Sequence, residues 1–146
     1  MSQEHYYDVS VQWIDGRKGT MKSDVLDNTI EVATPPQFAK GIEGMWSPEH
    51  LFVGAVNSCL MTTFLAIAEN SKLNYSGFAS KAVGKLELVE GKYAISEVKL
   101  MPKVIVTNEE DREKAIRILH KSEAACLISN SINSKVILEP TVAIAQ

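Results

Sequence analysis

The sequence predicts a single α+β domain, residues 1–146, in which antiparallel sheets wrap around one long buried helix. The helix is indicated by residues 47–71, SPEHLFVGAVNSCLMTTFLAIAENS, which are apolar nearly all the way round. Segments on both sides of it alternate apolar and polar residues, as strands do. The 146 residues suffice for one sizeable core, and the chain has no internal repeat, low-complexity tract or Gly/Ser linker.

The N-terminal strands are expected within residues 7–33. Residues 7–13 alternate with a period of two, which predicts a half-buried strand. Asp15-Gly16 is a turn signal, so residues 19–25 are expected to return as the second strand of a hairpin. A short third strand is expected over residues 29–33, before Thr34-Pro35-Pro36 breaks the pattern.

The loop that follows, up to Trp46, is unusually apolar. It contains Phe38, Met45 and Trp46. Two interpretations remain open: the loop is a lid on the core, or it is a pocket wall or subunit contact.

The start of the central helix is strongly marked. Ser47 is suited to be the N-cap and Pro48 to be the first helical residue. The carboxylate of Glu49 lies favourably near the positive end of the helix dipole. The apolar residues beyond leave no broad polar face, so we expect the helix to be buried.

A membrane span is the rival interpretation of this helix, because roughly 20 apolar residues would suffice. Polar residues interrupt the run, and its flanks lack the charge bias and aromatic border of a spanning helix. The first ten residues carry neither a basic nor an apolar signal region, so a soluble cytoplasmic protein is expected. The net charge of −3 and the absence of a basic run argue against nucleic acid and anionic membranes as partners.

The C-terminal half predicts a hairpin, a helix and a last strand. Residues 78–89 and 93–106 are strand-like and flank the turn Glu90-Gly91-Lys92. Asn108 precedes an acidic first helical turn, and a strand region over residues 135–144 is interrupted by Pro140.

Few residues offer chemistry. His5, His50 and His120 have no spacing that suggests a joint metal site, and no phosphate-binding glycine loop is present, so no metal or other cofactor is expected. Cys59 and Cys126 remain as candidate reactive residues. In a reducing compartment they are poor candidates for a permanent disulfide, and the alternative is that both are small hydrophobic core residues.

Cys59 lies several turns inside the helix, so the helix dipole does little to lower its pKa and burial would raise it. A reactive Cys59 would therefore need a cation from elsewhere. Arg112 and Arg117 are expected to be exposed on an acidic helix. Arg17, between two glycines at a hairpin tip, is the remaining arginine, although it could equally be a solvated turn residue.

Three segments resemble the OsmC/Ohr family, the osmotically inducible and organic hydroperoxide resistance proteins. SPEHLFVGAVNSCL resembles the family's central helix, DGRKGTMKSD its N-terminal Gly-Arg hairpin, and AACLISNSI its second-cysteine segment, in matching order over nearly the whole chain. The resemblance implies an OsmC-like fold and a role in the oxidative stress response, as a thiol-dependent peroxidase of organic hydroperoxides or hydrogen peroxide. One departure is Leu127, because family members often have proline directly after the second cysteine.

The resemblance also implies roles for four residues. Cys59 would be the peroxidatic thiolate and Cys126 the resolving thiol, Arg17 would stabilise the thiolate, and Glu49 would position Arg17. Oxidation would give a sulfenic acid and then a disulfide, which an external dithiol must reduce.

Glu49 and Cys59 are ten residues apart, roughly 15 Å along a helix, so one chain cannot easily bring both to the same peroxide. The resemblance implies an intertwined homodimer with its active sites at the interface.

Two other functions remain open. A dimer of the same fold could bind a small molecule or sense redox state without turnover, which Leu127 and the apolar loop motivate. An acyl hydrolase with a cysteine nucleophile would need a histidine base, and His50, nine residues from Cys59 on the same helix, is poorly placed for that.

Overall fold

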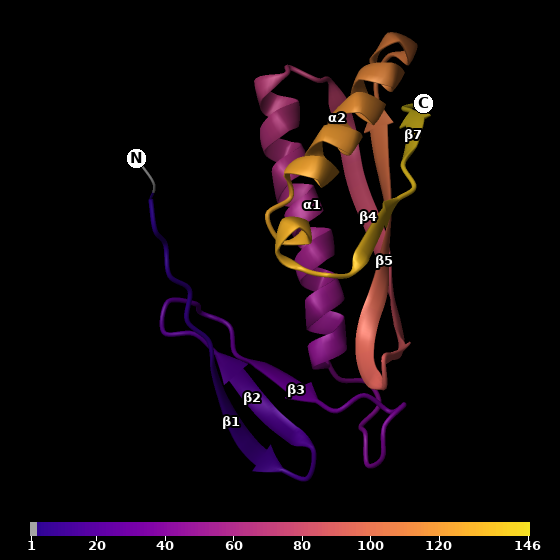
Figure 1. Ribbon diagram of the computed structural model, residues 1–146. Helices are drawn as coiled ribbons and strands as arrows, with labels where there is room; N and C mark the ends of the chain where they lie inside the picture. The colour runs from indigo at the N-terminus through magenta and orange to yellow at the C-terminus, as the bar shows by residue number, and fades with distance from the viewer. Residues whose placement is uncertain (1–2) are drawn as a thin grey trace. The chain divides into compact units, whose positions relative to one another are not determined.

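The computed structural model describes residues 3–146, in two compact units that divide between Leu51 and Phe52. The first unit contains a three-stranded antiparallel sheet of β1 (Ser10–Asp15), β2 (Lys18–Lys22) and β3 (Ile30–Ala33), in that order (Figure 1). The three predicted strands are confirmed, with β1 beginning at Ser10 rather than at Tyr7. The expectation of a single domain stays a prediction.

The β1–β2 hairpin turns at Gly16 and Arg17, as the Asp15-Gly16 signal predicts. Gly16 has φ +54°, a left-handed conformation that glycine adopts without a Cβ clash. The indole N–H of Trp13 donates to the Gly16 carbonyl at 3.1 Å and stabilises the turn.

The predicted half-burial of the first strand is wrong for the described chain. Every residue of β1 is exposed, including Val11 at 67% and Trp13 at 74%. The alternation therefore marks an apolar strand that residues 3–146 of a single chain leave uncovered.

The second unit is built on a long antiparallel hairpin of β4 (Tyr75–Val89) and β5 (Lys92–Val106). The short strands β6 (Lys135–Leu138) and β7 (Thr141–Ile144) both pair with β5 in parallel, one after the other. The predicted hairpin is confirmed, and the break at Pro140 separates β6 from β7.

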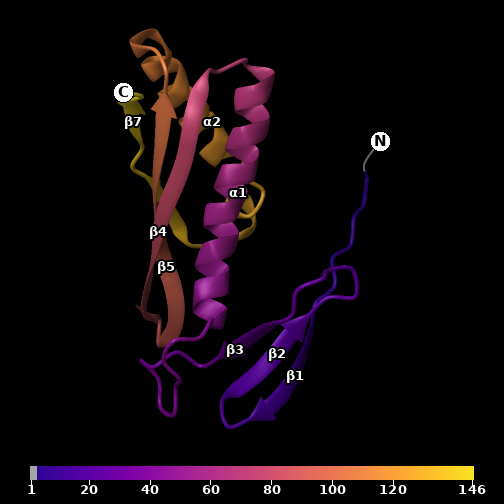
Figure 2. The ribbon, with the colours of Figure 1, turned by 180° about the vertical axis from the view of Figure 1, so that it is seen from behind.

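Two helices pack on one face of this sheet. They are α1 (Pro48–Asn70) and α2 (Arg112–Ala125), and a short 3₁₀ helix, η1 (Glu109–Asp111), leads into α2. Asn108 precedes the helical segment as predicted, but its side chain makes no capping hydrogen bond. In both views of the molecule α1 runs along the β4–β5 hairpin (Figures 1 and 2). The buried core residues are Val56, Leu60, Phe64 and Ala68 of α1, Val98, Leu100, Val104 and Val106 of β5, and Ala115, Ile118 and Leu119 of α2.

The start of α1 is confirmed, because the hydroxyl of Ser47 accepts the backbone N–H of His50 at 3.1 Å. The expected burial on all sides is wrong for a single chain. Only a stripe of every fourth residue is buried, whereas Met61 and Leu65 are 39% and 38% exposed. By length and composition α1 could cross a membrane, a test that the core helix of a soluble protein also passes.

A pair of reciprocal hydrogen bonds fixes α1 against β4. The Asn57 amide donates to the Ser80 carbonyl at 2.9 Å, and the Ser80 hydroxyl donates to the Asn57 side-chain oxygen at 2.7 Å. Asn57 precedes Cys59 by two positions, so this pair sets the rotation of the helix segment that carries the cysteine.

We expect Asn57→Ala to lower the free energy of unfolding by about 1–3 kcal/mol, because it leaves partly buried polar groups of Ser80 without partners. Ser58→Ala is the matched control, since the exposed Ser58 hydroxyl bonds only to the Ala55 carbonyl of its own helix. Urea unfolding should show a change within about 0.5 kcal/mol for that control. Equal losses in the two variants would contradict this role of Asn57.

Candidate functional site

The fold brings together the two cysteines, which are far apart in the sequence. Cys59 lies on α1 and Cys126 directly follows α2; both are free thiols, and they lie close enough that each shifts the pKa of the other. Cys126 is completely buried, whereas Cys59 is partly exposed. Cys59 is therefore the sulfur that a molecule from solution meets first.

A tight turn after α2 places the second cysteine. Cys126 has an extended backbone (φ −65°, ψ 115°) that ends the helix. The chain then turns, with the Asn130 N–H donating to the Cys126 carbonyl at 3.0 Å and the Ser131 N–H donating to the Ile128 carbonyl at 3.0 Å. The Ile128 side chain packs against the core cluster that contains Val56 of α1. This packing holds the turn close to the middle of α1.

The two thiols have opposite pKa shifts. Burial acts to raise the pKa of Cys59, but hydrogen bonds from Cys126, the Ile128 backbone, Thr63 and the Leu127 backbone together lower it. The pKa of Cys126 is raised, first by burial and then by its contact with Cys59. Of the two, Cys59 is thus the sulfur that loses its proton more readily, and Cys126 the one that keeps it. The expectation that burial raises the pKa of Cys59 is wrong, because hydrogen bonds from its own chain outweigh burial. The need for a cation at a reactive Cys59 stays a prediction.

Arg17 and Glu49, the other two predicted site residues, lie in or at the edge of the first unit. Arg17 lines a cavity of about 350 Å³ whose other walls include Trp13 and Pro48. Within residues 3–146 its side chain makes no ion pair within 4 Å and no hydrogen bond. One carboxylate oxygen of Glu49 is buried and has no hydrogen-bond partner among residues 3–146. The structure does not pair the two residues, and their roles stay predictions.

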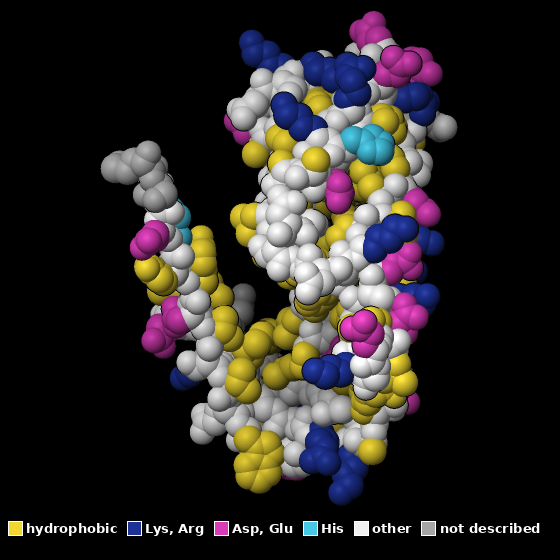
Figure 3. Space-filling model, viewed as in Figure 1, with side chains coloured by type: hydrophobic (Ala, Val, Ile, Leu, Met, Phe, Trp, Pro, Cys, Tyr) yellow, Lys and Arg dark blue, Asp and Glu magenta, His cyan; other side chains and the backbone are white. Residues whose placement is uncertain are grey.

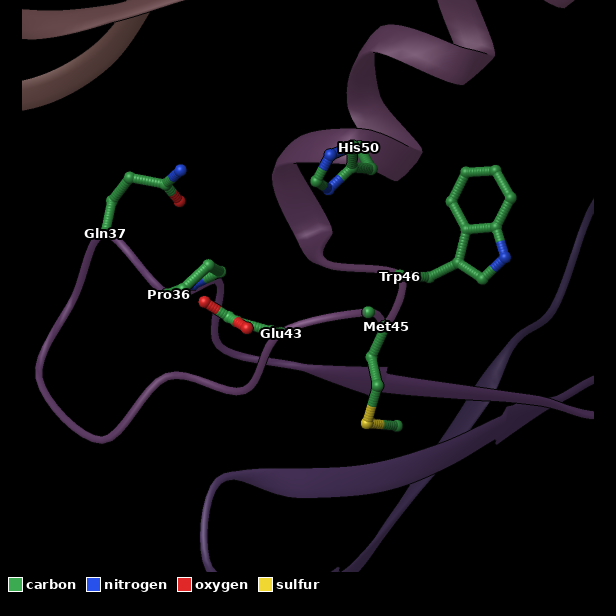
Figure 4. A pocket seen from close by; sticks show the side chains of 7 residues that line it. Pro36, Gln37, Glu43, Met45, Trp46 and His50 are labelled. Carbon is green, nitrogen blue, oxygen red and sulfur yellow. The ribbon is translucent and has the colours of Figure 1, made fainter.

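A second cavity, of about 500 Å³, lies beside the first turn of α1 (Figure 4). Met45 and Trp46 line it together with His50 and Glu43, which favours the pocket-wall interpretation for this end of the loop. Phe38 is not among the lining residues.

His50 in this cavity pairs with a serine, since its Nδ1 lies 2.7 Å from the Ser47 hydroxyl oxygen. A Ser–His pair can form a nucleophile in hydrolases. Ser47 is completely buried, however, and its hydroxyl already caps α1. The pair therefore offers no accessible nucleophile, which weighs against a hydrolase built on it.

Sequence reasoning missed three hydrogen-bonding groups that lower the pKa of Cys59. Thr63 could have been found, because a residue four positions along a helix shares its face, and its hydroxyl oxygen lies 3.9 Å from the Cys59 sulfur. The backbone N–H groups of Leu127 and Ile128 leave no signal in a sequence, because every residue except proline has such a group. In residues 3–146 the structure has no group of three or more His, Cys, Asp or Glu residues that could hold a metal ion.

Comparisons with known proteins agree with this architecture. The family of OsmC-like proteins matches residues 41–141. The uncharacterized protein YmaD of Bacillus subtilis is 25% identical over 144 residues, which are 95% of this chain and 93% of that protein. The solved structure of an OsmC-like protein of unknown function from Vibrio cholerae has a TM-score of 0.84 at 25% identity and covers 94% of this chain and 99% of its own.

Two structures of organic hydroperoxide resistance proteins share the fold at lower identity. The protein from Legionella pneumophila has a TM-score of 0.77 at 19% identity, covering 97% of this chain and 99% of its own. OhrB of Bacillus subtilis has a TM-score of 0.70 at 20% identity, covering 94% of this chain and 98% of its own. Since the family match spans more than half of the sequence, the chain belongs to the family of OsmC-like proteins.

Proposed function

We propose that this protein is a thiol-dependent peroxidase that reduces organic hydroperoxides or hydrogen peroxide with Cys59 and Cys126. The observation that carries the proposal is that the fold brings the two free thiols together, with one sulfur partly exposed and the other buried; the pKa of the first is lowered and that of the second raised. Membership of the OsmC-like family supports a redox role in peroxide stress, since proteins of the same fold are named for hydroperoxide resistance.

The chemistry needs only these two sulfurs and a proton donor. The Cys59 thiolate attacks one peroxide oxygen, the O–O bond breaks, and the departing oxygen takes a proton and leaves as an alcohol or water. Cys59 is now a sulfenic acid. The Cys126 sulfur attacks it, a disulfide forms, and the hydroxyl leaves with the Cys126 proton as water. An external dithiol then reduces the disulfide, with no metal or flavin in the cycle.

The contact between the sulfurs suits both steps. As a hydrogen-bond donor, the Cys126 thiol stabilises the charge on Cys59 before oxidation. The same closeness shortens the movement that Cys126 needs in order to attack the sulfenic acid. Its burial and raised pKa keep it protonated, so peroxide in solution reacts with Cys59 first.

We further infer that the working form is a soluble, cytoplasmic homodimer in which Arg17 and Glu49 of one chain complete the site at Cys59 of the other. Within residues 3–146 Arg17 has no ion pair and one buried oxygen of Glu49 has no hydrogen-bond partner, which supports a missing contact. Apolar surface supports it too: hydrophobic side chains gather over the strands of the first unit (Figure 3), and one side of α1 is partly exposed. A second copy would cover both surfaces, and no membrane or nucleic acid is needed as a partner.

Steady-state consumption of tert-butyl hydroperoxide in the presence of dithiothreitol tests the proposed function. We expect many turnovers per Cys59 with the dithiol and a single one without it. The second candidate is a redox sensor or small-molecule binder, which the cavity beside His50 favours. A sensor would oxidise once and stop, and a binder would leave both thiols reduced, so either result would overturn the peroxidase proposal.

A further inference from the structure

Arg17 is one of the two residues in the tight turn between β1 and β2, and the other is Gly16. The central peptide unit of this turn joins the Gly16 carbonyl to the Arg17 N–H. Gly16 has φ +54°, whereas Arg17 does not have a positive φ. The two common forms of a two-residue hairpin turn differ in the orientation of the central peptide unit, and one of them needs a positive φ at both residues. The orientation of this unit therefore decides the direction in which the Arg17 side chain leaves the backbone.

The side chain of Trp13 holds this peptide unit from one side. Its indole N–H donates to the Gly16 carbonyl oxygen at 3.1 Å. Because a peptide unit is planar, a hydrogen bond to the Gly16 oxygen also fixes the N–H of Arg17.

The peptide unit on the other side of Arg17 is held by the sheet. The Arg17 carbonyl oxygen accepts the Thr34 N–H at 3.2 Å, which extends the pairing of Lys18 with Ala33 by one residue. Both peptide units that flank the Arg17 Cα are thus hydrogen bonded, one within the β2–β3 pair and one to an indole. Of these two contacts, only the one from Trp13 depends on a side chain.

Trp13 and Arg17 also line the same cavity, of about 350 Å³, together with Val11 and Val32. Within residues 3–146 the guanidinium makes no ion pair, so its direction depends on the backbone that carries it. Trp13 is 74% exposed, so packing among the described residues does not account for a tryptophan at this position. Its hydrogen bond to the turn does.

We propose that Trp13 is a positioning residue for Arg17, whose indole N–H fixes the Gly16–Arg17 peptide unit so that the guanidinium is directed into the cavity that both side chains line. A cation held in place before the reaction stabilises developing charge without reorganisation. That Arg17 acts on a peroxide rests on the proposed function, whereas the hydrogen-bonded turn does not.

Trp13→Phe tests the proposal, because phenylalanine keeps an aromatic ring and loses the N–H. The measured quantity is the rate constant for oxidation of Cys59 by tert-butyl hydroperoxide in a single turnover, in the wild-type and the Arg17→Ala background. We expect Trp13→Phe to lower this rate about three- to tenfold in the wild-type background, because one hydrogen bond that orients Arg17 is lost. In Arg17→Ala the same change should have no effect, since effects that act through one group are not additive.

A wild-type rate in Trp13→Phe would overturn the proposal. Equal slowing in the two backgrounds would overturn it as well, because the indole would then act as a cavity wall or through the stability of the fold.

NMR of the reduced protein gives a second test that contains no peroxide. The indole N–H of Trp46, the other tryptophan of the chain, donates to no acceptor among residues 3–146 and is the internal reference. The shift of the Trp13 indole proton should change less with temperature than that of Trp46. Trp13→Phe should change the three-bond coupling between the Arg17 N–H and Hα protons, which reports φ.

Equal temperature dependence of the two indole protons, or an unchanged Arg17 coupling, would overturn the proposal. A protein that passes the NMR test and still fails to consume peroxide would refute the proposed function alone.

Discussion

The Cys59→Ser variant is expected to lose all reaction with peroxide, whereas Cys126→Ser is expected to react once and stop at a sulfenic acid. Cys59 is the more exposed sulfur with the lowered pKa, and Cys126 is buried with a raised one. After one equivalent of an organic hydroperoxide, intact-mass spectrometry should show wild-type chains that have lost two hydrogens. The Cys126→Ser chains should gain one oxygen, and Cys59→Ser chains should keep their mass.

The two variants are matched controls for each other, because each replaces one sulfur of the same pair by a hydroxyl. Circular dichroism establishes that both are folded before the masses are compared. Oxidation of Cys126 in the Cys59→Ser protein would reverse the assigned roles. If both thiols of the wild type stay reduced, the peroxidase proposal fails and the binder becomes the better account.

Local signals in the sequence were enough to predict most elements. Ser47 and Pro48 fix the start of α1, because a cap and a missing donor act within one helical turn. The turns at Gly16 and Gly91 have positive φ angles that favour glycine, so both hairpins could be located. Pro140 separates β6 from β7 because it cannot donate to a sheet.

Burial was harder to predict than secondary structure. A hydrophobic pattern shows which surface will be covered, but it does not show whether the same chain or another molecule covers it. The alternation around Val11 and the apolar residues on both sides of α1 predict burial without showing whether the same chain or a second one supplies the cover. In residues 3–146 both surfaces remain partly or wholly exposed, as Trp13 and Met61 show. A homodimer would reconcile the sequence pattern with the exposure.

The site itself was predictable in its residue types and not in its contacts. The sequence singled out Cys59 and Cys126 as candidates, but only the folded chain shows that the two thiols are near enough for each to shift the pKa of the other. The activation of Cys59 was missed for a related reason. The groups that lower its pKa include the backbone N–H groups of Ile128 and Leu127, which any non-proline residue would supply.

Mixing two inactive variants should restore activity if the site is shared between subunits. Arg17→Ala is expected to lower the rate of Cys59 oxidation by about 10²- to 10³-fold, because a preorganised charge at the reacting oxygen is lost. Cys59→Ser lacks the nucleophile. In a mixed dimer, Cys59 of the first chain would meet Arg17 of the second, so one of its two sites would be complete.

The experiment unfolds the two variants together, refolds them and compares their peroxide consumption with that of each variant refolded alone. Random pairing of equal amounts should recover about one quarter of the wild-type rate, since half of the dimers are mixed and each has one complete site. Arg17→Lys keeps the charge and loses the planar fork, so it separates charge from geometry in the unmixed protein. A mixture no more active than its components would place Arg17 and Cys59 of each site in the same chain. The exposed β1 strand and the uncovered side of α1 would then need a different partner.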